Sequence, residues 1–442
     1  MRTVLQFIAI FHAPLFAQTL PLAPDAEVVD LTPRDGYFNE PSIAIDPHNP
    51  LKLVAAWQVN STAAFSVDGG HHWNVVGGVA TEDFRKSGDV SVTFDSRDHA
   101  ILCSIAFDQL GAAEYWAHGA TRNGIFIRRS LDGGKTWETK SIAVTAHPTA
   151  PGIPFEDKPY IAADNTNGPH SGNLYIGWTQ FTETNSVIMF SRSTDGGLAW
   201  SAPIPISTHA GLPRDDNGAV EGFTAAIGPG GAVYAAWADR DEIAFTFSKD
   251  GGKHFAHSRG VIPIAPPYFS VAGVSRANGF PVLGVDALSG AIYLTWADYR
   301  NGDIDVFCAV SRDHGRHWSS PVRVNNDTIH NGADQFFHWL SIDPVTGAAN
   351  IVFYDRRGDA RNRNTTVTLA RSTDGGKTFQ NFAWTETAFD THEDFLGDYT
   401  GIAAYDGRVF GIWAEERATE DGPKSHHTVV RVGRADFHAS AK

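Results

Sequence analysis

Short runs in which apolar residues alternate with small or polar ones recur along the whole chain, and they come in pairs. The first run of each pair ends in Asp or Gly, a short turn follows, and the second run ends near an aromatic residue. A period of two between turn-forming residues is typical of strands joined in β-hairpins. The pairs are SIAID and LVAAW, SVTFD and ILCSIAFD, YIAAD and LYIGW, TAAIG and VYAAW, LGVD and IYLTW, LSID and NIVFY, and GIAAYD and VFGIW. Helical periodicity is nearly absent, so we predict an all-β chain.

A second motif, Ser-x-Asp-x-Gly-x-x-aromatic (the Asp-box), follows six of these pairs at intervals of about 55–65 residues. In each box the Asp is expected to accept hydrogen bonds from backbone N–H groups two or three residues on, and the Gly supplies a conformation that a Cβ would forbid. A fixed period of this length indicates a stacked or radial array. The boxes are Ser66–Trp73, Ser130–Trp137, Ser193–Trp200, Ser248–Phe255, Ser311–Trp318 and Ser372–Phe379.

The seventh pair is followed by a third run, HTVVRVGRADF, without a box. The segment Ala26–Thr32 (AEVVDLT) can supply the missing outer strand and close the ring, which removes exposed sheet edges. We therefore predict a seven-bladed β-propeller, with a six-bladed ring and an irregular extra hairpin as the alternative. Because the repeat runs from end to end, residues 26–437 are expected to form one domain.

Composition and the N-terminus narrow the possible partners. The formal net charge of −15 argues against nucleic acid or an anionic membrane as a partner. Residues 1–17 carry one Arg, an apolar stretch and a small residue at Ala17, which predicts a cleavable signal peptide and a secreted or periplasmic location. No later stretch is long enough to span a membrane. Cys103 and Cys308 lie in apolar runs and are expected to be buried free thiols. We expect a monomer with no cofactor and no metal ion.

Strand direction divides the repeat between two rims. In a four-stranded blade, the start of the inner strand and the end of the second strand share one rim, and the Asp-box lies on the other. The boxes are therefore expected to be structural, and chemistry is expected on the first rim. Residues before the inner strands are Asn39, Glu40, Gly88, Asp89, Glu156, Asp157, Lys158, Glu221, Asp334, Gln335, Asp398 and Tyr399. Residues after the second strands are Asp108, Asp239, Arg240, Asp298, Tyr299, Arg300, Asp355, Arg356, Arg357, Glu415, Glu416 and Arg417.

Two interpretations of this rim remain open. The acid–Arg pairs can tie neighbouring blades together and offset each other's charge. Alternatively, the ring of carboxylates and guanidinium groups can form a site for a polar ligand at the mouth of the channel. Carboxylates placed close together raise one another's pKa, which suits acid/base roles, and Arg can grip a carboxylate with two hydrogen bonds.

The boxes, the opening NEPSIAIDPHNP, the stretches DKPYIAAD and FLGDYTGIAA, and the signal-like start resemble bacterial secreted Asp-box proteins of the sialidase superfamily. The resemblance covers almost the whole mature chain. It implies an Asp acid/base, a Tyr nucleophile paired with a Glu, and arginines that hold the sugar carboxylate. By position these are Asp89, Tyr399, Glu221 and some of Arg240, Arg300, Arg356 and Arg417. Glu40, Asp157, Asp334 and Asp398 complete the expected substrate-binding rim, although Glu40 occupies a place where sialidases carry an Arg.

The function expected from this resemblance is that of a secreted glycoside hydrolase acting on a terminal acidic sugar. Two alternatives stay open. A polysaccharide lyase on uronic-acid polymers would use a Tyr or His base and Arg to neutralise the uronate. A non-catalytic propeller would bind a glycan or a protein, and the similarity of the rim residues from blade to blade favours it, because an active site usually breaks symmetry. In each case the expected partner is a carbohydrate, a glycoconjugate or a protein.

Overall fold

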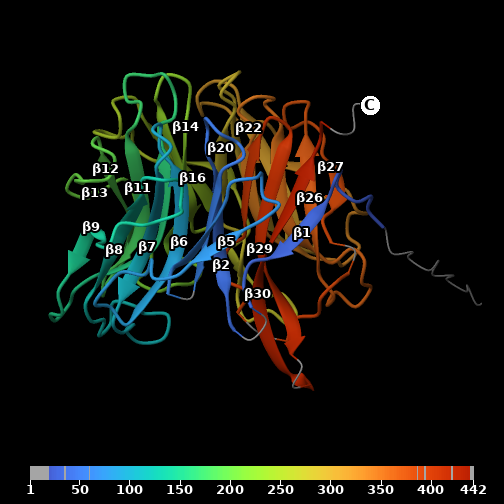
Figure 1. The fold of residues 1–442 in the computed structure, drawn as a ribbon, viewed down its shortest axis with the longest axis horizontal. Helices are drawn as coiled ribbons and strands as arrows, with labels where there is room; N and C mark the ends of the chain where they lie inside the picture. Colours follow the sequence, from blue (N-terminus) through green and yellow to red (C-terminus); the bar gives the residue numbers. More distant parts are fainter. Residues whose placement is uncertain are drawn as a thin grey trace, which may run out of the picture.

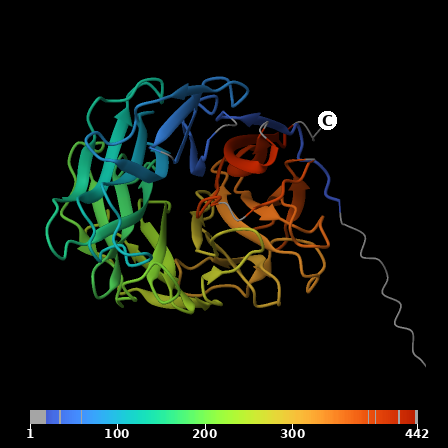
Figure 2. The ribbon, with the colours of Figure 1, turned by 90° about the horizontal axis from the view of Figure 1, so that it is seen from below.

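The computed structural model describes residues 19–33, 36–58, 60–385, 387–392, 395–419 and 422–438, with the backbone alone at 418, 419 and 422–426. These residues form β-strands and loops, with no helix among them. Seven four-stranded antiparallel sheets stand around a central axis (Figures 1 and 2). The predicted seven-bladed propeller is confirmed. The predicted signal peptide at residues 1–17 lies outside the described residues.

Each blade runs outward from an inner strand. The first three blades are β2 (Asn39–Ile45), β3 (Leu53–Gln58), β4 (Thr62–Ser66) and β5 (Asn74–Val76); β6 (Lys86–Phe94), β7 (Ala100–Phe107), β8 (Asn123–Ser130) and β9 (Ile142–His147); and β10 (Phe155–Ala163), β11 (Leu174–Phe181), β12 (Ser186–Ser193) and β13 (Ile204–Pro205). The next three are β14 (Val220–Ile227), β15 (Val233–Asp239), β16 (Glu242–Ser248) and β17 (Arg259–Pro263); β20 (Val282–Val285), β21 (Ile292–Asp298), β22 (Asp305–Ser311) and β23 (Val322–Arg323); and β24 (Gln335–Ile342), β25 (Ala349–Asp355), β26 (Thr366–Ser372) and β27 (Gln380–Ala383).

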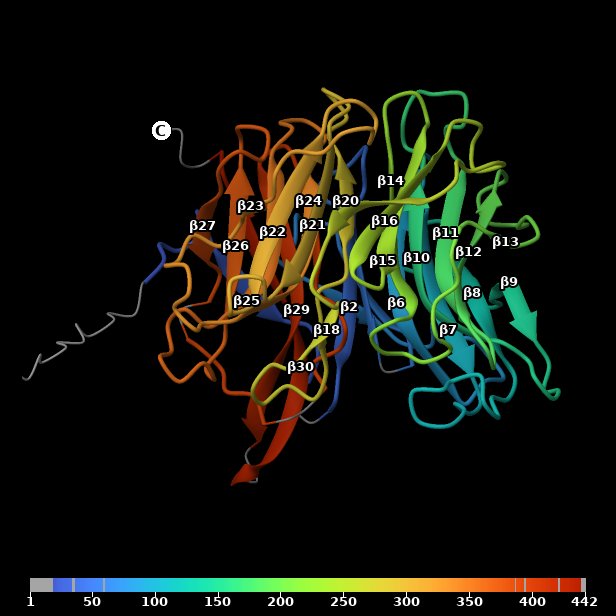
Figure 3. The same ribbon diagram turned by 180° about the vertical axis from the view of Figure 1, so that it is seen from behind.

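The last blade closes the ring with a strand from the other end of the chain. It contains β28 (Gly401–Tyr405), β29 (Arg408–Thr419), β30 (Gly422–Asp436) and, as its outer strand, β1 (Glu27–Asp30). β1 pairs antiparallel with β30 over its whole length, and Arg431 Nε donates to Asp30 Oδ1 at 2.8 Å. The prediction that the segment around Ala26–Thr32 completes the blade is confirmed. β29 and β30 extend as a long hairpin beyond the body (Figure 3).

Aromatic residues at matching places on the second strands pack between the blades. Trp57, Trp178, Trp237, Trp296 and Trp413 are all essentially inaccessible to solvent. Burying a side chain of this size removes 150–250 Å² from water and dominates the energetics of a core. The Trp that ends five of the seven second runs, visible in the sequence, is therefore a main contributor to the packing of the blades.

The six repeated turns at the ends of the third strands share one hydrogen-bonding pattern. In the turn at Ser372–Phe379, Ser372 Oγ donates to Asp374 Oδ1 at 2.8 Å and accepts from Gly376 N at 3.0 Å. Asp374 Oδ1 accepts from the backbone N–H groups of Lys377 and Thr378 at 3.0 and 3.1 Å. In all six turns the Asp accepts from the backbone N–H four positions on, and in the turns of Asp250 and Asp374 it also accepts from the residue three positions on, as predicted.

Candidate functional site: an acidic cavity at the mouth of the propeller

A cavity of about 400 Å³ opens on the rim where the inner strands begin. Five carboxyl groups and two cations line it together with aromatic and aliphatic side chains. A concave site that combines apolar surface with a few convergent polar groups is the usual form of a ligand site. The lining residues are Glu40, Gln58, Asp89, Ile105, Phe107, Leu110, Trp116, Phe155, Asp157, Lys158, Asp215, Ser275, Arg276, Phe395 and Asp398.

Backbone bulges in the inner strands present the residues of this rim. Register shifts interrupt five inner strands near their first residues, for example between Asn39 and Ser42 in β2 and between Gly88 and Ser91 in β6. Glu40, Asp89 and Lys158 have φ values of 50°, 46° and 50° at these bulges. A non-glycine residue in the left-handed region is uncommon and costs free energy, and bulges near functional sites re-aim side chains. The sequence predicted that these residues lie around the channel mouth, but it did not predict the bulges.

Two insertions bring in residues that sequence reasoning missed. The connection between β17 and β20 contains a small sheet of β18 (Tyr268–Phe269) and β19 (Ala277–Asn278), and it supplies Tyr268 and Arg276. Asp215 comes from the loop between β13 and β14. β18 lies at the same end of the molecule as the projecting hairpin (Figure 3). The signal for the first insertion was its length, since it is the longest connection between a box and the next inner strand, and extra length in a repeat often maps to the binding face.

Asp215 is held by three donors from different loops. Arg276 Nη1 donates to Asp215 Oδ2 at 2.7 Å and Trp116 Nε1 donates to the same oxygen at 3.0 Å. The hydroxyl of Tyr268 donates to Asp215 Oδ1. Asp215 is thus fixed in orientation at the cavity wall.

The hydroxyl of Tyr268 also lies 3.0 Å from Glu221 Oε2. Burial raises the pKa of Glu221 well above its usual value, and the negative charge of Asp215 raises it further. Burial likewise raises the pKa of Tyr268, with Asp215 and Glu221 adding to the effect, so its phenol stays protonated. Glu221 is therefore paired with Tyr268, behind the cavity wall.

The two cations of the cavity are committed to carboxylates. Besides its bond to Asp215, Arg276 donates from Nε to Asp398 Oδ1 at 2.9 Å and from Nη2 to Asp398 Oδ2. Lys158 Nζ lies 3.4 Å from Asp398 Oδ2, over the rings of Phe280 and Tyr399. Burial alone would raise the pKa of Asp398, but Arg276 and Lys158 lower it below its usual value. Arg276 is thus fully hydrogen-bonded to Asp215 and Asp398, whereas Lys158 Nζ lies beside Asp398 but donates no hydrogen bond within the described residues.

The remaining carboxyl groups have few donors. The side chains of Glu40 and Asp89 both line the cavity and interact electrostatically. Burial raises the pKa of Glu40 well above its usual range, and the charges of Asp89 and Asp398 add to this. Burial and the charges of Asp89 and Asp215 do the same for the pKa of Asp157. Asp157 receives no side-chain hydrogen bond within the described part of the chain.

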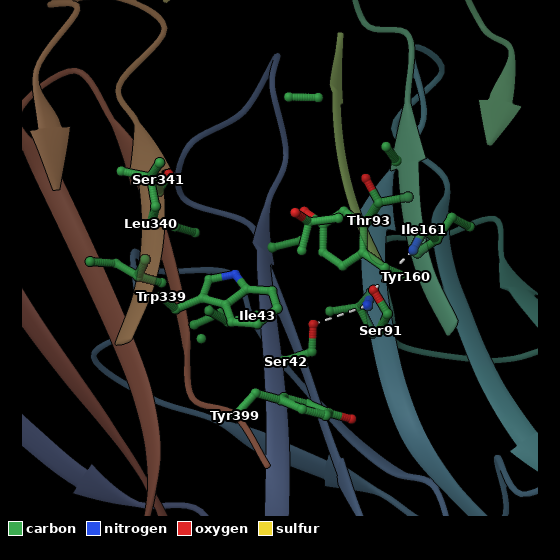
Figure 4. A pocket seen from close by; sticks show the side chains of 18 of the residues that line it. Ser42, Ile43, Ser91, Thr93, Tyr160, Ile161, Trp339, Leu340, Ser341 and Tyr399 are labelled. Atoms are coloured by element: carbon green, nitrogen blue, oxygen red, sulfur yellow. Dashed lines mark hydrogen bonds between the residues drawn. The ribbon is translucent and has the colours of Figure 1, made fainter. Parts of the chain in front are cut away.

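A second cavity, of about 280 Å³, lies in the central channel between the inner strands (Figure 4). Tyr160, Trp339 and Tyr399 face this space, and the Trp339 ring lies 5.9 Å from that of Tyr160 and 5.8 Å from that of Tyr399. The Tyr399 hydroxyl donates to the carbonyl oxygen of Val90 at 3.2 Å. Lys158 lines both cavities. Tyr399 is thus placed in the channel, where its hydroxyl bonds Val90, and the tyrosine that bonds Glu221 is Tyr268.

The four arginines that were predicted to bind the sugar carboxylate lie outside the acidic cavity. They form hydrogen bonds or ion pairs with nearby residues instead. Arg240 Nε bonds Asp239 at 3.2 Å, Arg300 Nε bonds Asp298 at 2.8 Å, and Arg417 lies 2.6 Å from Glu415. Arg356 is fully buried and donates to the hydroxyls of Thr365 and Thr391.

Asp334, another residue of the predicted substrate-binding rim, also forms hydrogen bonds with nearby residues. Its side chain accepts from the backbone N–H of Ile304 at 3.1 Å and from Asn362 Nδ2 at 2.6 Å. It does not line the acidic cavity. At three of these five positions the acid and the Arg offset each other's charge within one strand end, as in the first interpretation, but these pairs do not join neighbouring blades.

One group of side chains has the donors for a metal ion. Atoms of Asp46, His48 and Asp98 lie within 4.8 Å of one another on the opposite rim, the only such group in the described ranges. His48 Nδ1 lies 2.6 Å from Asp98 Oδ1, and Lys52 Nζ lies 3.4 Å from Asp46 Oδ2. The lysine already supplies positive charge there, so these contacts account for the group without an ion.

Comparison with known proteins identifies the fold. No protein-family model matches the chain, and no curated protein matches it. An ulvan lyase with a bound saccharide has a TM-score of 0.53 at 11% identity, with 91% of this chain and 95% of that chain covered. An α-L-arabinofuranosidase from Fusarium graminearum (TM-score 0.49, 12% identity, 79% and 93% covered) and a Hadza microbial sialidase (0.48, 16%, 89% and 75%) are also similar. The described residues include no helix long and apolar enough to cross a bilayer.

Proposed function

We propose that the protein is a glycoside hydrolase whose reaction takes place in the acidic cavity. The observation that carries the proposal is the pairing of two carboxyl groups in opposite environments. Asp215 accepts hydrogen bonds from three donors, whereas burial and neighbouring charges raise the pKa of Asp157, in the same cavity, well above its usual value. Two carboxyl groups whose environments push them to opposite protonation states are the usual acid and base of glycosidic bond cleavage.

In this mechanism Asp157 donates its proton to the leaving glycosidic oxygen. Asp215 lies beside the developing positive charge of the sugar ring, stabilises it, and accepts a proton from the attacking water. Asp215 then releases its proton to solvent and Asp157 takes one up from solvent, so both residues are restored and the net reaction is hydrolysis. Trp116 and Phe395 line the same cavity and offer flat surfaces for a sugar ring. Tyr268, Trp116 and Arg276 act as positioning residues, since each fixes Asp215.

The charged groups that line the cavity indicate whether its substrate carries a carboxylate. The predicted substrate was an acidic sugar gripped by several arginines. Arg276 and Lys158 are the only cations that line the cavity within the described residues, and both are paired with carboxylates. An anionic sugar would also meet three further carboxyl groups, those of Glu40, Asp89 and Asp157. These contacts favour a sugar without a carboxylate over both a sialic acid and the uronate of a lyase substrate.

The test is incubation with separate panels of neutral, amino, sialylated and uronic-acid glycans. New reducing ends report hydrolysis, and ultraviolet absorbance reports the unsaturated product of a lyase. We expect reducing ends without absorbance from the neutral or amino panel. Asp157→Asn should lower kcat by about 10²–10⁴-fold, the usual contribution of general acid catalysis. The matched control is Glu183→Gln, which removes an exposed carboxyl outside the cavity.

Other outcomes would contradict the proposal in different ways. A product with ultraviolet absorbance would show that the reaction is an elimination and not a hydrolysis. If the protein binds glycans but forms no product, it is a non-catalytic binding module. Turnover by Asp157→Asn equal to that of the wild type would remove Asp157 as the acid even if hydrolysis is observed.

A further inference from the structure

The acidic cavity contains a carboxyl pair that lacks a donor. Glu40 is 2% exposed, and its Oε2 atom is buried and receives no hydrogen bond from any donor in the described residues. Its neighbour in the cavity lining is Asp89, another carboxyl group. An unpaired buried carboxyl costs free energy unless a proton or another donor joins it. A proton held between the two side chains would meet this need in the free protein.

The groups that face this pair do not supply the missing charge. Glu40 Oε1 accepts from the backbone N–H of Asp398 at 3.3 Å. The charged side chains around the pair are Asp398, Lys158 and Arg276, and the first is bonded to both of the others. Tyr399 faces it with a neutral ring and hydroxyl. Lys158 acts on both carboxyls of the pair through its charge and Arg276 acts on Asp89, but within the described residues neither cation donates a hydrogen bond to the pair.

We propose that the Glu40–Asp89 pair recognises a sugar amino group, so that the substrate of the acidic cavity is a glycan with free amino groups. This rests on the proposed function. An ammonium group is a compact charge with three N–H donors, and it can replace the shared proton by donating to both carboxylates. A divalent metal ion fits less well. It needs several oxygens close together, and within the described ranges only Asp46, His48 and Asp98 form such a group.

The position of the pair agrees with the proposed chemistry. Glu40, Asp89 and Asp157 line one cavity, and the negative charge of Asp89 acts on both Glu40 and Asp157. An amino group bound by the pair would place the attached sugar ring in reach of the acid and of Asp215. Glu40 and Asp89 are then substrate-binding residues, and the left-handed backbone at each of them sets the aim of its side chain.

The experiment uses the wild-type protein and monosaccharides, which have no glycosidic bond to hydrolyse. Glucosamine, galactosamine and mannosamine are titrated calorimetrically at a pH where their amines are charged, each against its N-acetyl form. We expect at least one amino sugar to bind ten-fold or more tighter than its N-acetyl form. Titration in two buffers of different ionisation enthalpy should show protons released on binding, since the shared proton leaves when the ammonium group arrives.

Two variants separate this site from general charge attraction. Glu40→Gln should abolish both the preference for the amino form and the proton release. Glu183→Gln removes an equal charge from an exposed position and should change neither. If all three amino sugars bind no tighter than their N-acetyl forms, the inference falls, whether or not neutral glycans are hydrolysed. Hydrolysis of neutral glycans would then leave the proposed function standing alone. Preference for amino sugars with no hydrolysis of any glycan would overturn the proposed function instead.

Discussion

The carboxyl groups on the two rims of the propeller have opposite surroundings. On the rim of the repeated turns, partial burial would raise the pKa of Asp68, but the backbone N–H of His72, its imidazole and the Ser66 hydroxyl lower it to about 2. Around the acidic cavity, burial and neighbouring carboxylates raise the pKa of Glu40 and Asp157. One rim surrounds its carboxylates with donors, and the other leaves several without them.

The difference separates stability from chemistry. A carboxylate that accepts several hydrogen bonds from one short turn fixes that turn, and its charge is already satisfied. A carboxyl group without donors destabilises the fold but keeps its capacity to exchange a proton or bind a cation. The repeated rim is also nearly symmetric. The cavity is not, because Asp215 comes from the connection before β14, and Tyr268 and Arg276 come from the connection after β17, which carries the small sheet of β18 and β19. This asymmetry favours an active site over the symmetric binding module.

The sharpest comparison within the cavity rim is between its two tyrosines. Tyr268→Phe removes one donor from Asp215, and hydrogen bonds to charged groups contribute about 1.5–3 kcal/mol, so kcat should fall roughly 10–100-fold. Tyr399→Phe should lose much less, because its hydroxyl bonds a backbone carbonyl in the channel. Turnover is measured on folded protein with matched circular dichroism. A loss confined to Tyr399→Phe would restore Tyr399 as the nucleophile implied by the resemblance to sialidases.

On the opposite rim, Asp374→Ala should lower stability and leave catalysis alone. The change removes the acceptor for Ser372, Lys377 and Thr378. Loss of such a side-chain cap costs about 1–2 kcal/mol. Chemical denaturation measures the free energy of unfolding, and kcat is measured below the transition. A fall in kcat at unchanged stability would mean that the repeated turns take part in the chemistry.

The smallest effect is the pH dependence of stability, and its sign should differ between the rims. The pKa of Glu40 is raised in the folded state, so its contribution is present below the unfolded pKa and is lost as pH rises through the folded value. Glu40→Gln should therefore gain stability relative to the wild type as the pH rises above the unfolded pKa of Glu40, by about 1.4 kcal/mol per unit of pKa difference.

The pKa of Asp374 is lowered to about 2, chiefly by the Thr378 hydroxyl, against a smaller opposing effect of burial. Its contribution is present above the unfolded pKa and is lost as pH falls towards 2, so the deficit of Asp374→Ala should shrink on acidification. Unfolding curves at a series of pH values check both variants. If the stability difference from the wild type changed with pH in the same direction for both variants, the contrast between the two rims would be wrong.

The sequence alone determined the architecture. Alternating runs, a repeated Trp and six boxes at a regular interval each depend on neighbours within one blade, so they can be read locally. The same holds for ring closure, because HTVVRVGRADF lacked an outer partner and AEVVDLT had no other place to pair. Strand direction also placed Glu40, Asp89, Asp157 and Asp398 together on one rim, and the structure has all four in the cavity lining.

Only the tertiary structure decided how that rim is used. Asp215, Tyr268 and Arg276 lie outside the repeat, and their contacts join residues 53 to 122 positions apart, which no local pattern predicts. The arginines that follow the second strands look like candidates in sequence, yet Asp239, Asp298 and Glu415 already hold three of them. Whether a charged side chain is free for a ligand depends on every group packed around it, and that is fixed only when the blades and loops come together.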